Sequence, residues 1–179
     1  MQKRIFIING EPHSGKDMFV SCFKCITHEP TIQVSMIDKI KQVAKTLGWN
    51  EIKDLKSRKF LSDLKDITDE YNNYSMNYIE EKIVKFLNQK NPNKYMFIHA
   101  RSPYDIEYLK NKYNNIQSIL IVRDKDTVDE VIYDNHADKD IYDYTYDYEL
   151  INPGDSIKKY NEIIMNFYES IKEDEKEDK

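Results

Sequence analysis

Four consecutive apolar residues, Ile5 to Ile8, lead directly into Asn9-Gly10. An unbroken apolar run of this length is typical of a strand buried on both faces, and such strands occur in parallel sheets with helices on each side. Four further segments have strand character and alternate with helical patterns: 31–36, 95–98, 116–122 and 146–151. This alternation predicts an α/β fold of three layers, with a central parallel sheet of about five strands and helices on both faces. Tyr142, Tyr144, Tyr146 and Tyr148 alternate with polar residues, which predicts a half-buried strand there.

The segment after the first strand has the pattern G-x-x-x-x-G-K, in the form Gly10-Glu11-Pro12-His13-Ser14-Gly15-Lys16. Between a buried strand and a helix, this pattern is typical of a phosphate-binding loop, or P-loop. Its glycines let several backbone N–H groups face one anion, the following helix adds the positive end of its dipole, and Lys16 adds a charge for the outer phosphates. We therefore predict a P-loop NTPase fold. The residues expected to bind a nucleoside triphosphate are Gly10, Pro12, His13, Ser14, Gly15, Lys16 and Asp17.

Asp17 follows the lysine of the motif, where most P-loops carry a serine or threonine hydroxyl that helps to hold Mg²⁺. A carboxylate can bind Mg²⁺ or one of its waters, which makes Asp17 the candidate metal ligand. The alternative is that Asp17 only stabilises the N-terminus of the helix. Both interpretations remain open at this level.

The composition fits one globular domain and argues against several kinds of partner. Of the 179 residues, 40% are hydrophobic and 33% are charged. No stretch approaches the ~18 apolar residues of a membrane helix. The net charge of −5 argues against nucleic acid as a partner, because neutralising phosphates requires a basic face. The apolar run at Ile5 is too short for a signal peptide, so we expect a cytoplasmic protein. We expect a single domain over residues 1–171 and a charged, flexible tail over 172–179.

Arginine is scarce: the 27 basic residues include only Arg4, Arg58, Arg101 and Arg123. A position that keeps arginine in a lysine-rich chain suggests a need for the planar, bidentate guanidinium. Arg101 and Arg123 follow two predicted strands, and ligands of parallel sheets bind at the carboxyl ends of strands. Arg58 lies in a helical insertion, about 37–92. Lys65 lies two turns after Arg58, and we expect it on a solvated helix face.

With Asp17 included, the motif resembles the variant P-loop of phage-type deoxynucleoside monophosphate kinases and animal-type phosphomevalonate kinases, which belong to the nucleoside-monophosphate-kinase-like group. Three further segments resemble that family in the same order. Residues 34–38 resemble its Ser-x-x-Asp stretch, 97–103 its strand-end I-D-x-R-x-P, and 148–152 its strand and asparagine near the adenine site. The resemblance implies ATP- and Mg²⁺-dependent phosphoryl transfer to a small phosphorylated metabolite, most readily a nucleoside monophosphate.

The resemblance also implies residue roles. Lys16, Arg101, Arg123 and Asp38 would be catalytic, Asp38, Arg58 and Arg101 would hold the acceptor, and Asn152 would contact the donor nucleotide. For a hydroxyl acceptor, Asp38 would be the best-placed base. The alternative for Asp38 is an N-cap of the helix that begins near Lys39.

Two departures from the family keep a second function open. His99 stands where the family has an Asp that partners Mg²⁺. The expected lid, about 124–146, is rich in Asp and Tyr, with Lys125 and Lys139 as its only basic residues. An acidic lid stabilises transferring phosphate poorly, so the alternative is a nucleotide-binding regulatory module with little or no transferase activity. His13 and His99 are either phosphate neighbours or ordinary polar residues, and the oligomeric state is left open.

Overall fold

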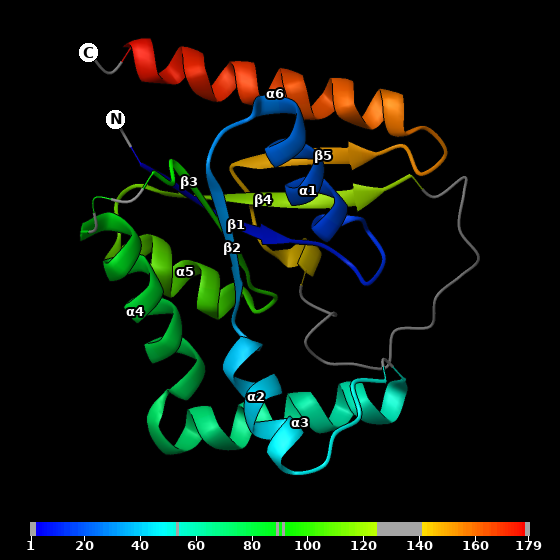
Figure 1. Ribbon diagram of the computed structural model, residues 1–179, viewed down its shortest axis with the longest axis vertical. Helices are drawn as coiled ribbons and strands as arrows, with labels where there is room; N and C mark the ends of the chain where they lie inside the picture. The colour runs from blue at the N-terminus through cyan, green and yellow to red at the C-terminus, as the bar shows by residue number, and fades with distance from the viewer. Residues whose placement is uncertain (1–2, 53, 89, 91, 125–140, 178–179) are drawn as a thin grey trace.

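The computed structural model describes residues 3–52, 54–88, 90, 92–124 and 141–177. Its centre is a sheet of five parallel strands in the order β2-β3-β1-β4-β5 (Figure 1). The strands are β1 (Arg4–Asn9), β2 (Thr31–Ser35), β3 (Tyr95–His99), β4 (Ile116–Arg123) and β5 (Tyr148–Asn152). The predicted parallel α/β sheet is therefore confirmed. Most of the expected lid, residues 125–140, lies outside the described residues.

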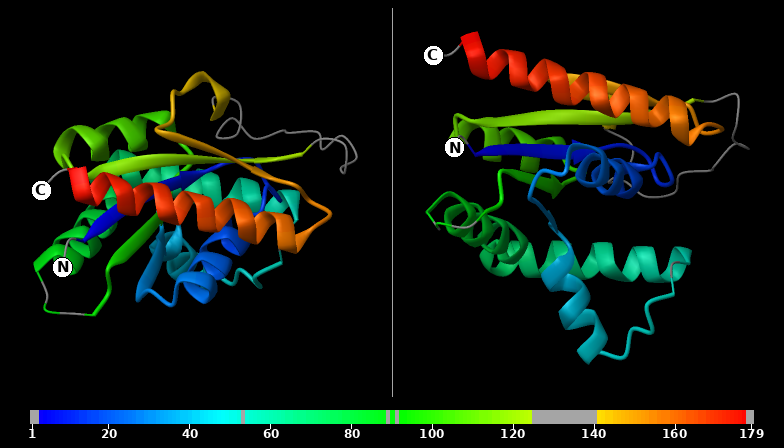
Figure 2. Two further views of the ribbon diagram at one scale, coloured as in Figure 1. Left: turned by 90° about the horizontal axis from the view of Figure 1, so that it is seen from above. Right: turned by 45° about the horizontal axis from the view of Figure 1, so that its top comes forward.

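The side chains of β1 divide the hydrophobic core into two halves. Ile5 and Ile7 belong to the half that contains residues of α4 (Tyr74–Asn88) and α5 (Pro103–Lys112). Phe6 and Ile8 belong to the other half, under α1 (Lys16–Thr27) and α6 (Ile157–Glu177). Figure 2 shows these helices on opposite sides of the sheet. Because successive side chains of a strand point to opposite faces, a strand covered on both sides is apolar at every position, which explains the unbroken run.

Aromatic rings anchor α1 to the sheet. Phe23 of α1 packs edge-on against Phe97 of β3 with ring centroids 5.1 Å apart, and Phe97 stacks on Phe6 of β1 at 5.5 Å. Phe167 of α6 packs edge-on against Phe6 at 5.4 Å. Large buried rings in such offset and edge-on arrangements add packing energy beyond their buried area. The helix that follows the P-loop is therefore fixed to the strand that precedes it.

The predicted helical insertion consists of α2 (Asp38–Thr46), α3 (Leu55–Asn72) and α4. Asp54 caps α3, since its side chain accepts a hydrogen bond from the Ser57 N–H at 2.7 Å. In Figure 1, α2 and α3 lie at the bottom, on the opposite side of the sheet from α6, and residues of both helices line one cavity with residues from the ends of β2 and β3. The insertion thus forms a wall opposite the sheet edge at which a ligand would bind.

The expectation that the alternating tyrosines form a strand is wrong. Tyr142 lies in a short 3-10 helix (Ile141–Asp143), Tyr144 and Tyr146 lie in the connection, and only Tyr148 belongs to β5. The Asp147 carboxylate accepts hydrogen bonds from the N–H and the hydroxyl of Ser118, at 2.6 and 2.8 Å. The Asp147 side chain thus binds Ser118 where a strand would form backbone hydrogen bonds. The pairing of β4 with β5 starts one residue later, with Ile119 and Tyr148.

Helix α6 continues through Glu177. It therefore includes most of the segment 172–179 that we expected to form a charged tail, and residues 178–179 lie outside the described residues. Within the helix, Asp174 lies 3.7 Å from the Arg4 guanidinium and accepts a hydrogen bond from the Tyr148 hydroxyl at 3.2 Å. These contacts connect the last turns of α6 to β1 and β5.

Candidate active site

All five strands end at one edge of the sheet, and each ends on a polar residue: Asn9, Ser35, His99, Arg123 and Asn152. Parallel sheets bind their ligands at this edge. Asn9 is fully buried and connects three segments there. Its side-chain amide donates to Arg101 O at 3.0 Å and to the Tyr146 hydroxyl at 2.8 Å, and its Oδ1 accepts from the Gly10 N–H at 2.8 Å. The start of the P-loop is therefore held to the end of β3.

The P-loop requires glycine at both ends. Gly10 has a φ of +146° and Gly15 a φ of +93°. A Cβ on Gly10 would lie 2.3 Å from Ile121 O, and a Cβ on Gly15 would lie 2.3 Å from Asn152 Nδ2. Gly15 is also the N-cap of α1, and no side chain caps this helix. A helix N-terminus without a side-chain cap, preceded by a curled loop, suits a bound anion.

The Lys16 side chain lies across the loop. Its ammonium donates hydrogen bonds to the carbonyl oxygens of Gly10 and Glu11 and lies 3.4 Å from Ser14 Oγ. The long, flexible side chain of lysine allows the ammonium to exchange these oxygens for those of a phosphate. Lys16 thus lies where it can meet an anion held by the loop, and its contact with the outer phosphates of a nucleotide stays a prediction.

Asn152 supports the loop from behind. Its side chain is buried, with the residue 2% exposed. Nδ2 donates to Ser14 O at 2.9 Å, and Oδ1 accepts from the Gly154 N–H at 3.0 Å. Both ends of the amide are therefore engaged with the P-loop and the turn before α6. Asn152 therefore positions the loop, and its contact with the donor nucleotide stays a prediction.

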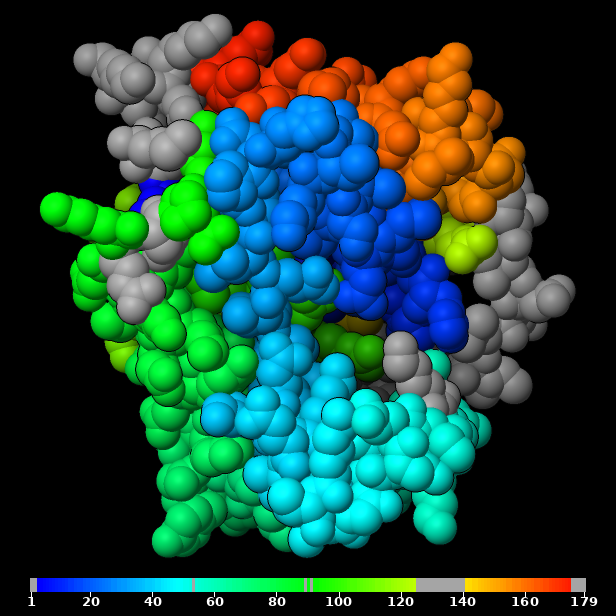
Figure 3. Space-filling view, in the orientation of Figure 1, coloured from blue at the N-terminus to red at the C-terminus, as the bar shows by residue number. Residues whose placement is uncertain are grey.

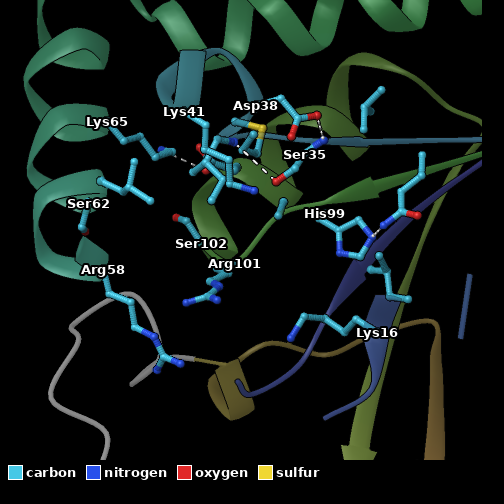
Figure 4. A pocket seen from close by; sticks show the side chains of 18 of the residues that line it. Lys16, Ser35, Asp38, Lys41, Arg58, Ser62, Lys65, His99, Arg101 and Ser102 are labelled. Carbon is cyan, nitrogen blue, oxygen red and sulfur yellow. Dashed lines mark hydrogen bonds and ion pairs between the residues drawn. The ribbon is translucent and has the colours of Figure 1, made fainter. Parts of the chain in front are cut away.

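A cavity of about 620 Å³ separates the P-loop from the insertion (Figure 3). Its polar lining comes from five segments and includes Lys16, Asp17, Gln33, Asp38, Lys41, Arg58, Lys65, His99 and Arg101. Figure 4 shows the side chains of Lys16, Arg58 and Arg101 pointing toward the same space. The fold thus gathers charges of the P-loop, of α3 and of the β3 end around one cavity.

Two of the predicted arginines contact the P-loop at His13. The Arg123 guanidinium donates to His13 O at 3.3 Å, and the Arg58 guanidinium lies 3.5 Å from His13 Nε2. Arg123 is not among the residues that line the cavity, whereas Arg58 and Arg101 are. Arg123 therefore contacts the loop from outside the cavity, and its catalytic role stays a prediction. Arg58 reaches from the insertion to the loop across the cavity.

The N-cap interpretation of Asp38 is wrong. Asp38 is the first residue of α2, the N-cap is Ile37, and no side chain caps the helix. The Asp38 carboxylate accepts a hydrogen bond from the Ser35 N–H at 2.8 Å and lines the cavity. The end of β2 therefore orients this carboxylate at the cavity.

Lys65 is not on a solvated helix face, contrary to our expectation. Its ammonium lies 2.9 Å from the Asp69 carboxylate and 3.4 Å from the Asp105 carboxylate, and its side chain is 22% exposed. Burial raises the pKa of Asp105, and Lys65 opposes that shift. Burial would lower the pKa of Lys65, but the Asp105 and Asp69 carboxylates together raise it. One lysine shared by two carboxylates thus forms part of the cavity wall.

His99 lies at the Lys16 end of the cavity (Figure 4). Burial lowers the pKa of His99 to about 4. The Asp17 carboxylate opposes this shift, and the cationic side chains of Lys16, Lys41 and Arg101 lower the pKa further. The imidazole is therefore neutral at neutral pH. The Asp17 side chain is 89% exposed and lies 3.9 Å from His99.

Sequence reasoning did not select Gln33, Lys41 and Lys65 as site residues, although all three line the cavity. Gln33 is a polar residue inside a predicted strand, and this was the only local sign of its role. Asp69 lies one helical turn after Lys65, a spacing that suggests an ion pair. Asp105, the second carboxylate that pairs with Lys65, lies on α5, and nothing in the sequence around it indicates this contact.

Among the described residues, no group of three or more His, Cys, Asp and Glu side chains is arranged to hold a metal ion. No helix in the same part of the chain is long and apolar enough to span a membrane.

Comparison with known proteins identifies related folds. No protein-family model matches the chain, and no curated protein matches its sequence. TT1252 from Thermus thermophilus has a TM-score of 0.52 at 8% identity, over 95% of this chain and 98% of that one. Shikimate kinase from Aquifex aeolicus VF5 has a TM-score of 0.48 at 10% identity, over 94% and 96%. A kinase candidate from Chloroflexus aurantiacus J-10-fl has a TM-score of 0.42 at 16% identity. The match covers 71% of this chain and 64% of the length of that protein. At these identities, the likeness to TT1252 concerns the fold alone.

Proposed function

We propose that the protein is a P-loop kinase that transfers a phosphoryl group from ATP to a small phosphorylated metabolite, most readily a nucleoside monophosphate. One observation carries this proposal: Lys16 of the P-loop opens onto the same cavity as Arg58 and Arg101, which come from the insertion and from the β3 end. A donor held at the loop and an acceptor phosphate held by these guanidinium groups would therefore face each other across one space. Phosphoryl transfer depends mainly on such positioning and charge neutralisation.

The residues divide into a donor side and an acceptor side. On the donor side, the P-loop backbone and Lys16 bind the triphosphate, while Asn152 and Arg123 maintain the shape of the loop. On the acceptor side, Arg58 and Arg101 bind the phosphate of the acceptor through their planar guanidinium groups. When the acceptor group is a phosphate, no strong base is required. Asp38 would be the base for a hydroxyl acceptor.

The proposed cofactor besides ATP is a divalent metal, which neutralises phosphate charge when it is bound. Asp17 fits this role because its exposed carboxylate follows Lys16 and lines the cavity. His99, at the end of β3, contributes a nitrogen in place of an acidic side chain. Mg²⁺ prefers oxygen ligands and keeps several waters, so Asp17 would be its protein ligand here.

The second candidate is a nucleotide-binding regulatory module with little transferase activity. The specific observation in its favour is the neutral His99 at the β3 end, beside a single carboxylate, Asp17. With one protein carboxylate for the metal, nucleotide binding is supported more strongly than catalysis. Both candidates predict ATP binding, and only the kinase predicts turnover.

A coupled assay of ADP release distinguishes the two candidates. ATP and Mg²⁺ or Mn²⁺ are supplied with each nucleoside monophosphate in turn, and Lys16→Ala serves as the inactive control. We expect turnover that depends on one acceptor and is lost in Lys16→Ala. ATP binding in calorimetry without turnover on any acceptor would favour the regulatory module, and no ATP binding at all would refute both.

A further inference from the structure

Two lone pairs converge on one point between α1, β2 and the end of β3. The Gln33 amide nitrogen lies 3.0 Å from Asp17 Oδ1 and 2.7 Å from His99 Nε2. An amide NH₂ group only donates, so both partners accept from it. The reverse orientation of the amide would place its oxygen against the carboxylate. Gln33 therefore occupies a position toward which a carboxylate oxygen and an unprotonated imidazole nitrogen both point.

The two acceptors are close enough to share a metal ion. Asp17 Oδ1 and His99 Nε2 lie 3.9 Å apart. Zn²⁺ binds such atoms at roughly 2.0–2.2 Å, and the larger Mn²⁺ binds them at slightly longer distances. Two ligands at this spacing can lie on one ion after a small movement of the exposed Asp17 side chain. The Gln33 side chain extends from a strand into the cavity, and it can withdraw without changing the backbone.

We propose that Asp17 and His99 form a mixed oxygen–nitrogen site for a divalent transition-metal ion, with Mn²⁺ as its occupant, and that the ion enters with the nucleotide. This inference rests on the proposed function and concerns the metal of the same site. Imidazole nitrogen binds transition-metal ions better than it binds Mg²⁺, which selects oxygen ligands. Mn²⁺ shares the oxygen preference of Mg²⁺ and is therefore also suited to the Asp17 carboxylate and the phosphates.

The charges around the site explain why the ion would require the nucleotide. His99 is surrounded by the cationic side chains of Lys16, Lys41 and Arg101, with Asp17 as the opposing charge. This environment repels a bare divalent cation. A bound triphosphate brings several negative charges to Lys16 and the P-loop and reverses the balance. The site is thus expected to bind Mn²⁺ weakly alone and tightly together with ATP.

Electron spin-echo spectroscopy tests the proposal directly on the whole chain. The sample contains Mn²⁺, a non-hydrolysable ATP analogue and protein whose histidines carry ¹⁵N, which separates them from the nitrogens of adenine. We expect ¹⁵N coupling from one histidine bound to Mn²⁺. The coupling should disappear in His99→Asp and persist in the control His28→Asn, since His28 is an exposed residue after α1 with a left-handed backbone that asparagine tolerates.

Calorimetry with the same variants gives a second readout. His99→Asp should reduce the preference for Mn²⁺ over Mg²⁺ in the nucleotide complex by about tenfold, and His28→Asn should leave it unchanged. Bound nucleotide and Mn²⁺ without histidine coupling in the parent protein would overturn the metal assignment and leave the proposed function intact. Failure of the parent to bind the analogue with either ion would overturn the proposed function and this inference together. If His99→Asp does not fold, His99→Gln takes its place as the variant that should lose the coupling, and a parent spectrum without histidine coupling refutes the assignment in either case.

Discussion

The substitution Gly15→Ala tests how the structure supports the P-loop. Gly15 has a φ of +93°, and an added Cβ would lie 2.3 Å from Asn152 Nδ2. The asparagine would have to move, which breaks its hydrogen bonds to Ser14 O and from the Gly154 N–H. The substitution therefore has two costs: backbone strain at Gly15 itself and loss of the Asn152 contacts.

The two costs can be estimated separately. An alanine in this left-handed conformation costs about 1–2 kcal/mol relative to glycine. Each lost hydrogen bond in a buried position costs on the order of 0.5–1.5 kcal/mol. We expect Gly15→Ala to lower the free energy of unfolding by about 2–5 kcal/mol. In an Asn152→Ala background the clash is absent, and the same substitution should cost only the backbone part.

A double-mutant cycle by urea denaturation measures this difference. The four proteins are the parent, Gly15→Ala, Asn152→Ala and the double variant. We expect a coupling energy of roughly 1–3 kcal/mol, because both single substitutions remove the same hydrogen bonds. Gly48→Ala is the matched control, since Gly48 also has a positive φ (+91°) but a Cβ added there would have no other atom within 4 Å. Equal costs of Gly15→Ala in both backgrounds would refute the proposed support by Asn152.

Four further predictions concern the site and the core. Lys16→Ala should weaken ATP binding in calorimetry, while the protein still unfolds cooperatively in urea; an unchanged ATP affinity would contradict the P-loop assignment. Arg101→Lys should reduce turnover by ~10²-fold with little effect on ATP affinity, because it keeps the charge but loses the bidentate contact; full turnover would exclude this role. Phe23→Ala should lower the free energy of unfolding by about 3–5 kcal/mol in urea, because Phe23 is fully buried. A loss below about 1 kcal/mol would show that the core can collapse around it. His99→Gln should flatten the pH dependence of stability. The pKa of His99 falls from 6.5 to about 4 on folding, so the unfolded state binds more protons between these two pH values. The stability of the parent therefore decreases as the pH falls through this window, by up to about 3 kcal/mol. Urea titrations of the metal-free protein across this window measure it, and identical slopes in parent and variant would contradict the burial argument.

Several site residues could be predicted because their signals are local. Gly10, Gly15 and Lys16 are recognised by their spacing between a strand and a helix, and the backbone angles at both glycines show why that spacing is needed. Arg58 and Arg101 were selected by their positions near strand ends and in the insertion, and both line the cavity. The role of each in binding phosphate stays a prediction.

Other residues could not be selected because their roles depend on distant partners. Lys65 was expected on the surface, but Asp105, which makes it part of the cavity wall, lies 40 positions later on α5. Asn152 is separated from its partner Ser14 by 138 positions. The tyrosine alternation was misinterpreted for the same reason, since the contact between Asp147 and Ser118 replaces the expected ladder.

Elements whose requirements are local follow from the amino-acid sequence alone. The apolar run of β1 demands burial on both faces, and the glycines of the P-loop demand backbone angles that other residues avoid. Which side chains share the cavity depends instead on tertiary packing. The strand order β2-β3-β1-β4-β5 places the ends of β2 and β3 beside the P-loop, and so brings Gln33 and His99 to Asp17. Contacts of this kind depend on how distant segments pack. Hydrophobic periodicity specifies which face of a helix or strand is buried, but not which other element packs against that face.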